Sequence, residues 1–176
     1  GGDLTPVQRR FSDLNADRWL ERVGGFAVDD PAMQLLGAAV HSVRAVPPQQ
    51  AAKVAEWATA AQAPLHAHVS EQPAENVECE AQFGCSPTAL FDRYGLVNER
   101  FTAIHATHTT VADATLLGRG KAACCFCPTT ERDLADGIGP SGQLVASGAR
   151  LSVGSDSHAV IDPFEEMRAV ELDHRL

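Results

Sequence analysis

The sequence predicts an α/β protein built around a parallel sheet, and three observations lead to this prediction. Short apolar segments with strand character alternate along the chain with segments of helical character, a pattern typical of βα repeats. The strand ends recur at intervals of 22 to 37 residues, close to the roughly 30 residues that one βα unit occupies. Histidines and an aspartate stand at several of these ends, where parallel α/β folds collect functional groups. We therefore expect five consecutive βα units.

The first units follow from capping residues and from apolar runs. Ser12 or Asp13 can cap the first expected helix, which two glycines end after Val23. The first strand is expected at residues 33–41, because an almost uninterrupted apolar run is typical of a strand buried on both faces. Residues 49–63 are rich in alanine and predict the next helix.

The remaining elements alternate in the same way. The further strands are expected at residues 64–69, 101–106, 122–127 and 150–155. The further helices are expected near residues 87–94, 111–118, 144–147 and 163–176. The stretch before residue 87 is interpreted only as polar, and residues 129–142 as a polar loop.

Composition sets limits on the class of protein. Of the 176 residues, 44% are hydrophobic and 21% are charged, as in ordinary globular proteins. The formal net charge of −9, without a basic run, argues against a nucleic-acid partner and against an anionic membrane surface. Apolar runs are too short for a membrane helix, and residues 1–3 lack the features of a signal peptide, so a cytoplasmic location is expected.

The cysteines are expected to be reduced. There are five, an odd number, and three of them crowd into residues 124–127, which we interpret as a strand. This crowding lacks the paired C-x-x-C spacing of a structural zinc site, and small thiols are common in protein cores. We therefore assign these three cysteines to packing.

The candidate site lies at the carboxyl ends of the expected strands. His41, His68, His105 and Asp156 each follow an apolar strand. In the segment His68-x-x-Glu71, the imidazole is a possible metal ligand and the carboxylate a possible proton carrier. Residues three apart on a straight strand face opposite sides, so this pair can act together only if the strand ends near residue 69. We expect the side chains to converge at one mouth.

These residues carry a family resemblance. The order His68-x-x-Glu71, then the segment 105–108, then the segment 154–158 resembles the amidohydrolase superfamily, in particular its metal-dependent aminohydrolases and deaminases. More narrowly, residues 41–46, 66–72 and 127–131 are similar to the formimidoylglutamate deiminases of histidine degradation. The resemblance runs from about Gln8 to the last residue.

The resemblance implies a role for each candidate residue. His68 and Asp156 match zinc ligands of the family, and Glu71 matches the residue that transfers protons. His105 matches the histidine beside the reacting water, and Asp156 would assist it. His41 and Arg44 match a pair that holds the substrate, with the planar fork of Arg44 suited to a carboxylate. The implied reaction is zinc-dependent hydrolysis of N-formimino-L-glutamate to N-formyl-L-glutamate and ammonia.

The sequence departs from the family in one large respect. Family members supply two more zinc ligands as a His-x-His pair on the first barrel strand, and no such pair precedes His41. His66 and His68 cannot be that pair, because the 88 residues from His68 to Asp156 are too few for seven βα units of roughly 30 residues. At 176 residues the chain is also shorter than the about 250 of a complete (β/α)8 barrel. We expect a single domain over residues 1–176, a partial (β/α)8 TIM barrel of the metal-dependent hydrolase type comprising strands four to eight.

Several expectations about function follow. One zinc ion is expected per complete site, with two ligands from the absent units, so the chain alone should be nearly inactive. The partners expected are a small-molecule substrate and, in the full-length protein, further copies of the chain. Two alternatives stay open: another aminohydrolase of the superfamily that acts on a heterocyclic ring and does not need Arg44, or a non-catalytic partial barrel.

Overall fold

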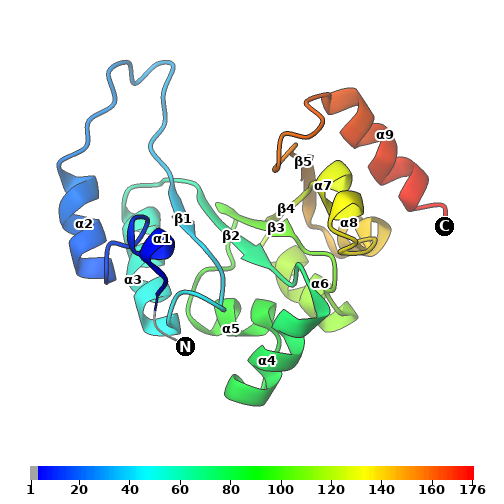
Figure 1. Cartoon of the computed structure of the whole chain (residues 1–176), viewed down its shortest axis with the longest axis horizontal. Coiled ribbons are helices and arrows are strands. Elements are labelled where there is room, and N and C mark those ends of the chain that lie inside the picture. Colours follow the sequence, from blue (N-terminus) through cyan, green and yellow to red (C-terminus); the bar gives the residue numbers. More distant parts are fainter. Residues whose placement is uncertain (1–3) are drawn as a thin grey trace.

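The computed structural model describes residues 4–176, so the expectation about a signal peptide, which rests on residues 1–3, lies outside the described residues. The described chain forms a five-stranded sheet in the order β1-β2-β3-β4-β5, and every neighbouring pair is parallel (Figure 1). The predicted fold class is confirmed: the protein is α/β, with the strand order of consecutive units from a (β/α)8 barrel.

The elements have the following bounds. The strands are β1 (Ala38–Val40), β2 (Leu65–Val69), β3 (Phe101–His105), β4 (Ala123–Phe126) and β5 (Arg150–Val153). The helices are α1 (Pro6–Arg9), α2 (Ala16–Gly24), α3 (Pro48–Ala60), α4 (Pro73–Phe83), α5 (Pro87–Arg93), α6 (Val111–Arg119), α7 (Pro128–Asp133), α8 (Ser141–Ser147) and α9 (Pro163–Asp173).

The hydrophobic core lies between one face of the sheet and the helices that follow the strands. Alternate strand residues such as Leu65, Ala67 and Val69 point into it, because side chains on a strand alternate between faces. Helices α3, α5, α6 and α8 cover this face and contribute apolar side chains such as Phe91 and Leu117 (Figure 1). The core therefore corresponds to the layer between strands and outer helices of a barrel.

The opposite face of the sheet is open. His66 and Ser152 on this face are exposed, and His68, Thr102 and Cys125 are half-buried. In a closed (β/α)8 barrel the inward face of the strands is filled by layers of side chains. The five strands described here therefore present an interior-type face that closure would cover.

The first strand is shorter than predicted, since β1 is limited to Ala38–Val40 rather than 33–41. Met33 and Leu35 are 83% and 75% exposed, so their apolar character does not reflect burial in a sheet. The side-chain oxygen of Gln34 accepts hydrogen bonds from the backbone N–H groups of Asp29 and Asp30 and closes a turn there. The paired strand β2 starts only at Leu65, so β1 has no ladder partner before Ala38.

The polar stretches contain two helices that the sequence analysis did not predict. The stretch before residue 87 holds α4, and the expected loop 129–142 begins with α7. Both start with proline in the first turn, and α4 ends before Gly84, whose φ of 69° is left-handed. Proline at the start and glycine after the end are the known asymmetry of helices and would have located α4. Apolar periodicity could not, since α4 buries only Glu75 and Cys79.

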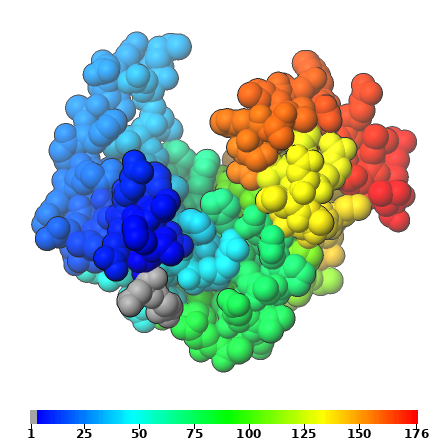
Figure 2. Space-filling model, viewed as in Figure 1, coloured from blue at the N-terminus to red at the C-terminus, as the bar shows by residue number. Residues whose placement is uncertain are grey.

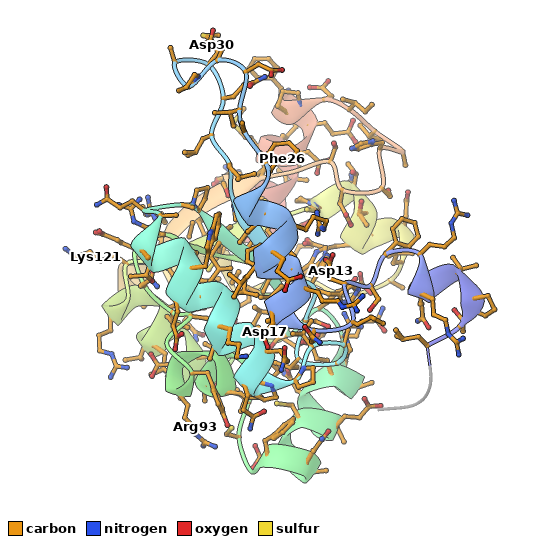
Figure 3. All side chains as sticks on the ribbon, turned by 90° about the vertical axis from the view of Figure 1, so that its left-hand side faces the viewer. Asp13, Asp17, Phe26, Asp30, Arg93 and Lys121 are labelled. Carbon is orange, nitrogen blue, oxygen red and sulfur yellow. The ribbon has the colours of Figure 1, made fainter. Side chains whose placement is uncertain are left out.

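The N-terminal helices also differ from the prediction. Helix α2 is capped by Asn15, whose side chain accepts the N–H of Arg18, and not by Ser12 or Asp13. The short helix α1 precedes it. Figure 3 shows α2 lying against α3, and there the Nζ of Lys53 contacts the carboxylate of Asp17 at 2.6 Å.

The two ends of the sheet carry segments that stand apart. Figure 2 shows the surface hollowed between the light-blue segment before β1 and the orange segment around residue 160. These segments flank the first and the last strand of an open sheet, which accounts for their separation. Across residues 4–176 the structure has no helix long and apolar enough to cross a membrane.

Candidate active site

Residues with a left-handed backbone conformation stand at the carboxyl ends of three strands. Ser70 after β2 has a φ of 51°, His105 at the end of β3 a φ of 69°, and Asp156 after β5 a φ of 40°. Such conformations are uncommon for residues other than glycine, cost about 1–3 kcal/mol each and cluster at functional sites. They turn the chain sharply where each strand ends. His105 thereby leaves the helix-covered face that strand alternation would assign to it, the face of Phe101 and Ala103.

The orientation of His68 is fixed by the neighbouring strand. Its Nδ1 lies 2.7 Å from the backbone oxygen of His41, which can only accept a hydrogen bond, so Nδ1 carries the proton. The lone pair is then on Nε2. A backbone or carboxylate acceptor on the second nitrogen is the usual way in which proteins orient a metal-binding histidine. The ring of His68 also lies against those of His41 and His105, with centroids 5.1 Å and 5.5 Å away.

Glu71 folds back toward His105. Strand β2 ends at Val69, as the joint action of His68 and Glu71 requires. The Oε1 of Glu71 lies 3.7 Å from the Nε2 of His105. Burial opposes ionisation of Glu71, but its hydrogen bond with Arg44 and the charge on His105 lower its pKa below the usual value. Glu71 is therefore a carboxylate at neutral pH, suited to accept a proton.

His105 is fully buried and held by Glu131, a residue to which the sequence analysis gave no role. The His105 Nδ1 lies 3.1 Å from the Glu131 Oε1, which also accepts the Cys127 N–H at 2.8 Å. Burial alone would lower the pKa of His105, but the hydrogen bond with Glu131 and the charges of Glu71 and Asp156 raise it. An acidic residue four positions after a strand-end cysteine is a weak sequence signal, because such residues are usually solvated.

Arg44 pairs with two carboxylates of the protein. Its Nη2 donates to the Oε2 of Glu71 at 2.6 Å, and its Nε lies 3.6 Å from the Oε2 of Glu75. The side chain remains 34% exposed. Arg44 thus sits at the predicted mouth, where it anchors Glu71. His41 is exposed beside it, with a hydrogen bond between its Nδ1 and the hydroxyl of Ser42.

Asp156 lies at the carboxyl end of β5 and is exposed. Because β4 and β5 are parallel, Asp156 follows β5 at the same end of the sheet at which Cys127 follows β4, and its charge raises the pKa of both His105 and Cys127. The six candidate residues therefore come from one end of the sheet. The structure brings His41, Arg44, His68, Glu71 and His105 into contact or near-contact with one another, whereas Asp156 acts on His105 through its charge.

The donors present fit a zinc ion. The Nε2 of His105 is buried without a hydrogen-bond partner among the described residues, and it faces Glu71. Two neutral imidazoles and carboxylates are donors that zinc accepts in catalytic sites. In the described chain, the compact group of three potential donors is His105, Cys127 and Glu131, which lie within 4.8 Å of one another. In that group, Glu131 already accepts hydrogen bonds from the His105 ring and from the Cys127 backbone N–H.

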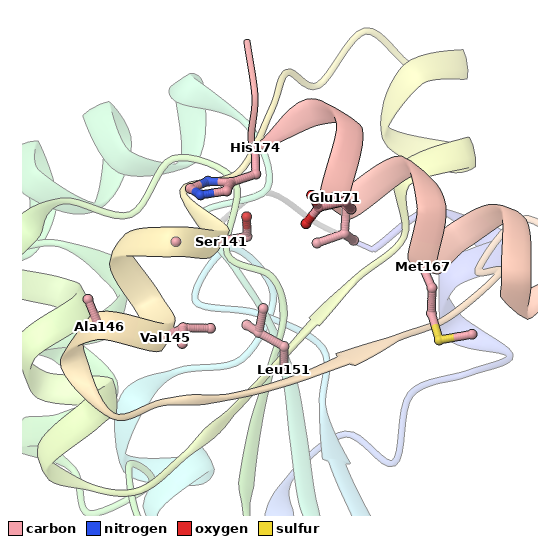
Figure 4. Close-up of a pocket in the computed structure, with 9 residues that line it drawn as sticks. Ser141, Val145, Ala146, Leu151, Met167, Glu171 and His174 are labelled. Carbon is pink, nitrogen blue, oxygen red and sulfur yellow. The ribbon is translucent and has the colours of Figure 1, made fainter.

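A surface pocket of about 510 Å³ lies elsewhere, between α8, β5 and α9. Figure 4 shows Val145, Leu151, Met167 and His174 around it. None of the six candidate residues lines this pocket. Its apolar walls come from the side of β5 that faces the outer helices, so this pocket and the candidate site are separate features of the molecule.

Comparison with known families agrees with this geometry. The family model of the amidohydrolase family matches residues 8–175. The chain belongs to the amidohydrolase family. Among curated amidohydrolase relatives, formimidoylglutamate deiminase from Pseudomonas aeruginosa is 36% identical over 177 aligned residues, which cover 100% of this chain and 39% of the relative. A 5-methylthioadenosine/S-adenosylhomocysteine deaminase from Desulforudis audaxviator is 33% identical over 135 residues, 75% of this chain and 31% of that protein.

Solved structures of amidohydrolases share the fold. An amidohydrolase from Brucella melitensis superposes with a TM-score of 0.83 and 31% identity, covering 99% of this chain and 39% of that one. An adenosine deaminase from Xanthomonas campestris with bound zinc superposes with a TM-score of 0.82 and 29% identity, covering 90% of this chain and 37% of that one. The chain thus spans about two fifths of the length of these proteins.

Proposed function

We propose that this chain carries part of the active site of a metal-dependent hydrolase that removes ammonia from an amidine-type C–N bond. One observation carries the proposal: the Nδ1 atoms of His68 and His105 are both tied to acceptors, so in the neutral rings the Nε2 atoms offer lone pairs beside the carboxylate of Glu71. The deaminase relatives and the zinc in the Xanthomonas campestris structure support it.

Each residue has a role in the proposed reaction. His68 and Asp156 would hold a zinc ion, together with ligands from units of the barrel outside this chain. Zinc, when bound, supplies a nucleophile at neutral pH by lowering the pKa of water. Glu71 accepts the proton of the attacking water and delivers it to the leaving nitrogen, which departs as ammonia. In its neutral form His105 accepts a hydrogen bond from the same water, and Asp156 helps to stabilise the charge that develops.

For the substrate we propose N-formimino-L-glutamate, which would give N-formyl-L-glutamate in histidine degradation. The support is the 36% identity to a formimidoylglutamate deiminase and the position of Arg44. Arg44 is partly exposed beside Glu71, so its guanidinium can also pair with a substrate carboxylate near the reacting group. His41, exposed at the same mouth, is a second substrate contact. The second candidate, a deaminase of adenosine-type compounds, is favoured by the 33% identity to such an enzyme.

The proposed assembly follows from the fold. A (β/α)8 barrel needs eight strands, and the described chain contains five. We propose that residues 1–176 act as one domain-sized part of a longer barrel, with one zinc per site. Association of full-length subunits and a cytoplasmic location remain predictions from the sequence.

The test uses a longer protein in which this chain is joined to the other barrel units. Ammonia release is measured with N-formimino-L-glutamate and, separately, with 5-methylthioadenosine. Glu71→Gln should lower kcat about 10²- to 10⁴-fold, the usual contribution of a general acid–base residue. Glu78→Gln, at an exposed position of α4, is the matched control and should retain full activity. Unchanged kcat in Glu71→Gln would contradict the mechanism.

Arg44→Met separates the two substrates. A carboxylate substrate loses an ionic contact, so KM should rise for N-formimino-L-glutamate in addition to any loss of kcat through Glu71. With 5-methylthioadenosine, which has no carboxylate for Arg44 to bind, only kcat should change. An unchanged KM for N-formimino-L-glutamate would contradict the assignment of this substrate.

A further inference from the structure

Glu131 is a buried carboxylate that the proposed reaction does not use. It lies in α7 with an exposed fraction of 4%, and the sequence resemblance assigned it no role. Its Oε1 accepts the backbone N–H of Cys127, four residues earlier, at 2.8 Å. This bond ties the carboxylate to the end of β4, so Glu131 cannot swing away from its neighbour across the sheet.

That neighbour is His105, and the contact decides which ring nitrogen carries the proton. A carboxylate can only accept, so the His105 Nδ1, 3.1 Å from the Glu131 Oε1, must be the donor. In the neutral ring the Nε2 then has a free lone pair. This Nε2 lies 3.7 Å from the Oε1 of Glu71 and has no hydrogen-bond partner in the part of the chain that the structure describes.

We propose that Glu131 is a positioning residue, whose hydrogen bond holds His105 in the Nδ1-protonated form and aims Nε2 at the space beside Glu71. A water or substrate atom in that space can donate to Nε2 only in this tautomer. The left-handed backbone at His105, with a φ of 69°, brings the ring within reach of Glu131. Which water or substrate atom binds the Nε2 of His105 rests on the proposed function. The tautomer of His105 does not rest on that function and can be tested separately.

The tautomer is measured on the 176-residue chain itself. The chain is labelled with ¹⁵N-histidine, and long-range ¹H–¹⁵N spectra are recorded at about pH 9, where free histidine is neutral. The His105 signals are assigned by their loss in His105→Gln. We expect a protonated Nδ1 and an unprotonated Nε2. A neutral ring protonated at Nε2 overturns the proposal without any variant of Glu131.

Two variants of Glu131 separate positioning from packing. In Glu131→Gln the amide oxygen can still accept from both Nδ1 and the Cys127 N–H, so the tautomer should persist. Glu131→Leu fills similar space without an acceptor, so a large fraction of His105 should move to the Nε2-protonated form. Glu165→Leu, at an exposed position of α9, is the control and should change nothing at His105. An unchanged tautomer in Glu131→Leu overturns the proposal.

Two further measurements distinguish the competing outcomes. In the longer protein, Glu131→Leu should lower kcat about 10- to 100-fold, as loss of an orienting partner does, with KM little changed and recovery in Glu131→Gln. If the tautomer shifts as expected while the longer protein releases no ammonia, the proposed function fails and the positioning role stands. Tight zinc binding by the chain that is lost in Cys127→Ser would make Glu131 a metal ligand and overturn the proposal.

Discussion

At the scale of single residues, Arg44 has two functions that compete for one guanidinium. It neutralises Glu71 and the fully buried side chain of Glu75, and it is the proposed contact for the substrate carboxylate. Burial raises the pKa of Glu75, whereas Arg44 helps to lower that of Glu71. Without Arg44, the pKa of each carboxyl should rise.

Arg44→Met should therefore destabilise the chain in a pH-dependent way. At about pH 7 the two carboxyl groups have lost their ionic partner in the folded variant, so each either stays unpaired or takes up a proton, and we expect a loss of about 1–3 kcal/mol. The folded pKa of each group then lies higher relative to its unfolded value, so the variant binds these protons more readily when folded. The loss should shrink as the pH falls from about 7 toward about 4. Urea unfolding at several pH values measures this.

Arg22→Met is the control for the loss of an arginine. Arg22 pairs with Asp13, but its side chain is 64% exposed. Exposed ion pairs are screened by water and contribute little to stability, so this variant should change stability little at any pH. A loss in Arg44→Met that is equally large across the pH range would show that packing, and not the two carboxylates, accounts for its effect.

The sequence located most residues of the candidate site, but it did not locate Glu131, which contacts His105. His68, His105 and Asp156 could be found because each follows an apolar strand, and the ends of parallel strands meet at one edge. The contact of Glu71 with His105 could be expected only on the condition that β2 ends at Val69. Glu131 carried no such signal, because its role depends on a distance across the sheet, between residues 26 positions apart.

At the scale of elements, helices α6 and α8 approach each other through a glycine. A Cβ added to Gly118 would lie 1.9 Å from the backbone oxygen of Ser147, which belongs to α8. Backbone atoms cannot move aside as a flexible side chain can. The contact explains why a residue of low helix propensity stands inside α6.

Gly118→Ala should therefore destabilise the chain by at least about 2 kcal/mol, because it forces the two helices apart. Gly24→Ala is the matched variant: Gly24 ends α2, and its added Cβ would meet nothing within 4 Å. This variant should be neutral or stabilising by up to about 1 kcal/mol. Chemical denaturation of both proteins measures the difference. Equal stability of the two variants would contradict the close approach of α6 and α8.

Element positions were predictable where burial and apolar character coincide. Strands β2 to β4 lie within the predicted ranges because their apolar residues pack on the helices. Strand β5 also lies within its predicted range, although Leu151 is 37% exposed. The prediction failed for residues 33–37, where apolar side chains are exposed and a run of them does not indicate a strand. It also missed α4, most of whose residues are exposed, and α7, whose buried residues are mainly polar, so neither shows apolar periodicity.

At the scale of the whole molecule, the open sheet has two edges. Strands β1 and β5 each have one neighbour within residues 4–176, and the face between them carries half-buried or exposed side chains. Unpaired edges and an uncovered face favour association with other chains. The isolated chain should therefore show an apparent mass that rises with concentration in size-exclusion chromatography with light scattering. A constant monomer mass over the whole concentration range would contradict this prediction.

The strand order has a kinetic consequence. Each strand pairs with the next one along the chain, as Ala38 does with Leu65 and Leu65 with Phe101. The loops closed by these pairings are similar in length, and loop-closure entropy grows only slowly with length. No described pairing has to wait for distant parts of the chain to meet, so the sheet can grow strand by strand in the order of synthesis. The slow, long-range event in such a barrel is then the joining of its first and last strands.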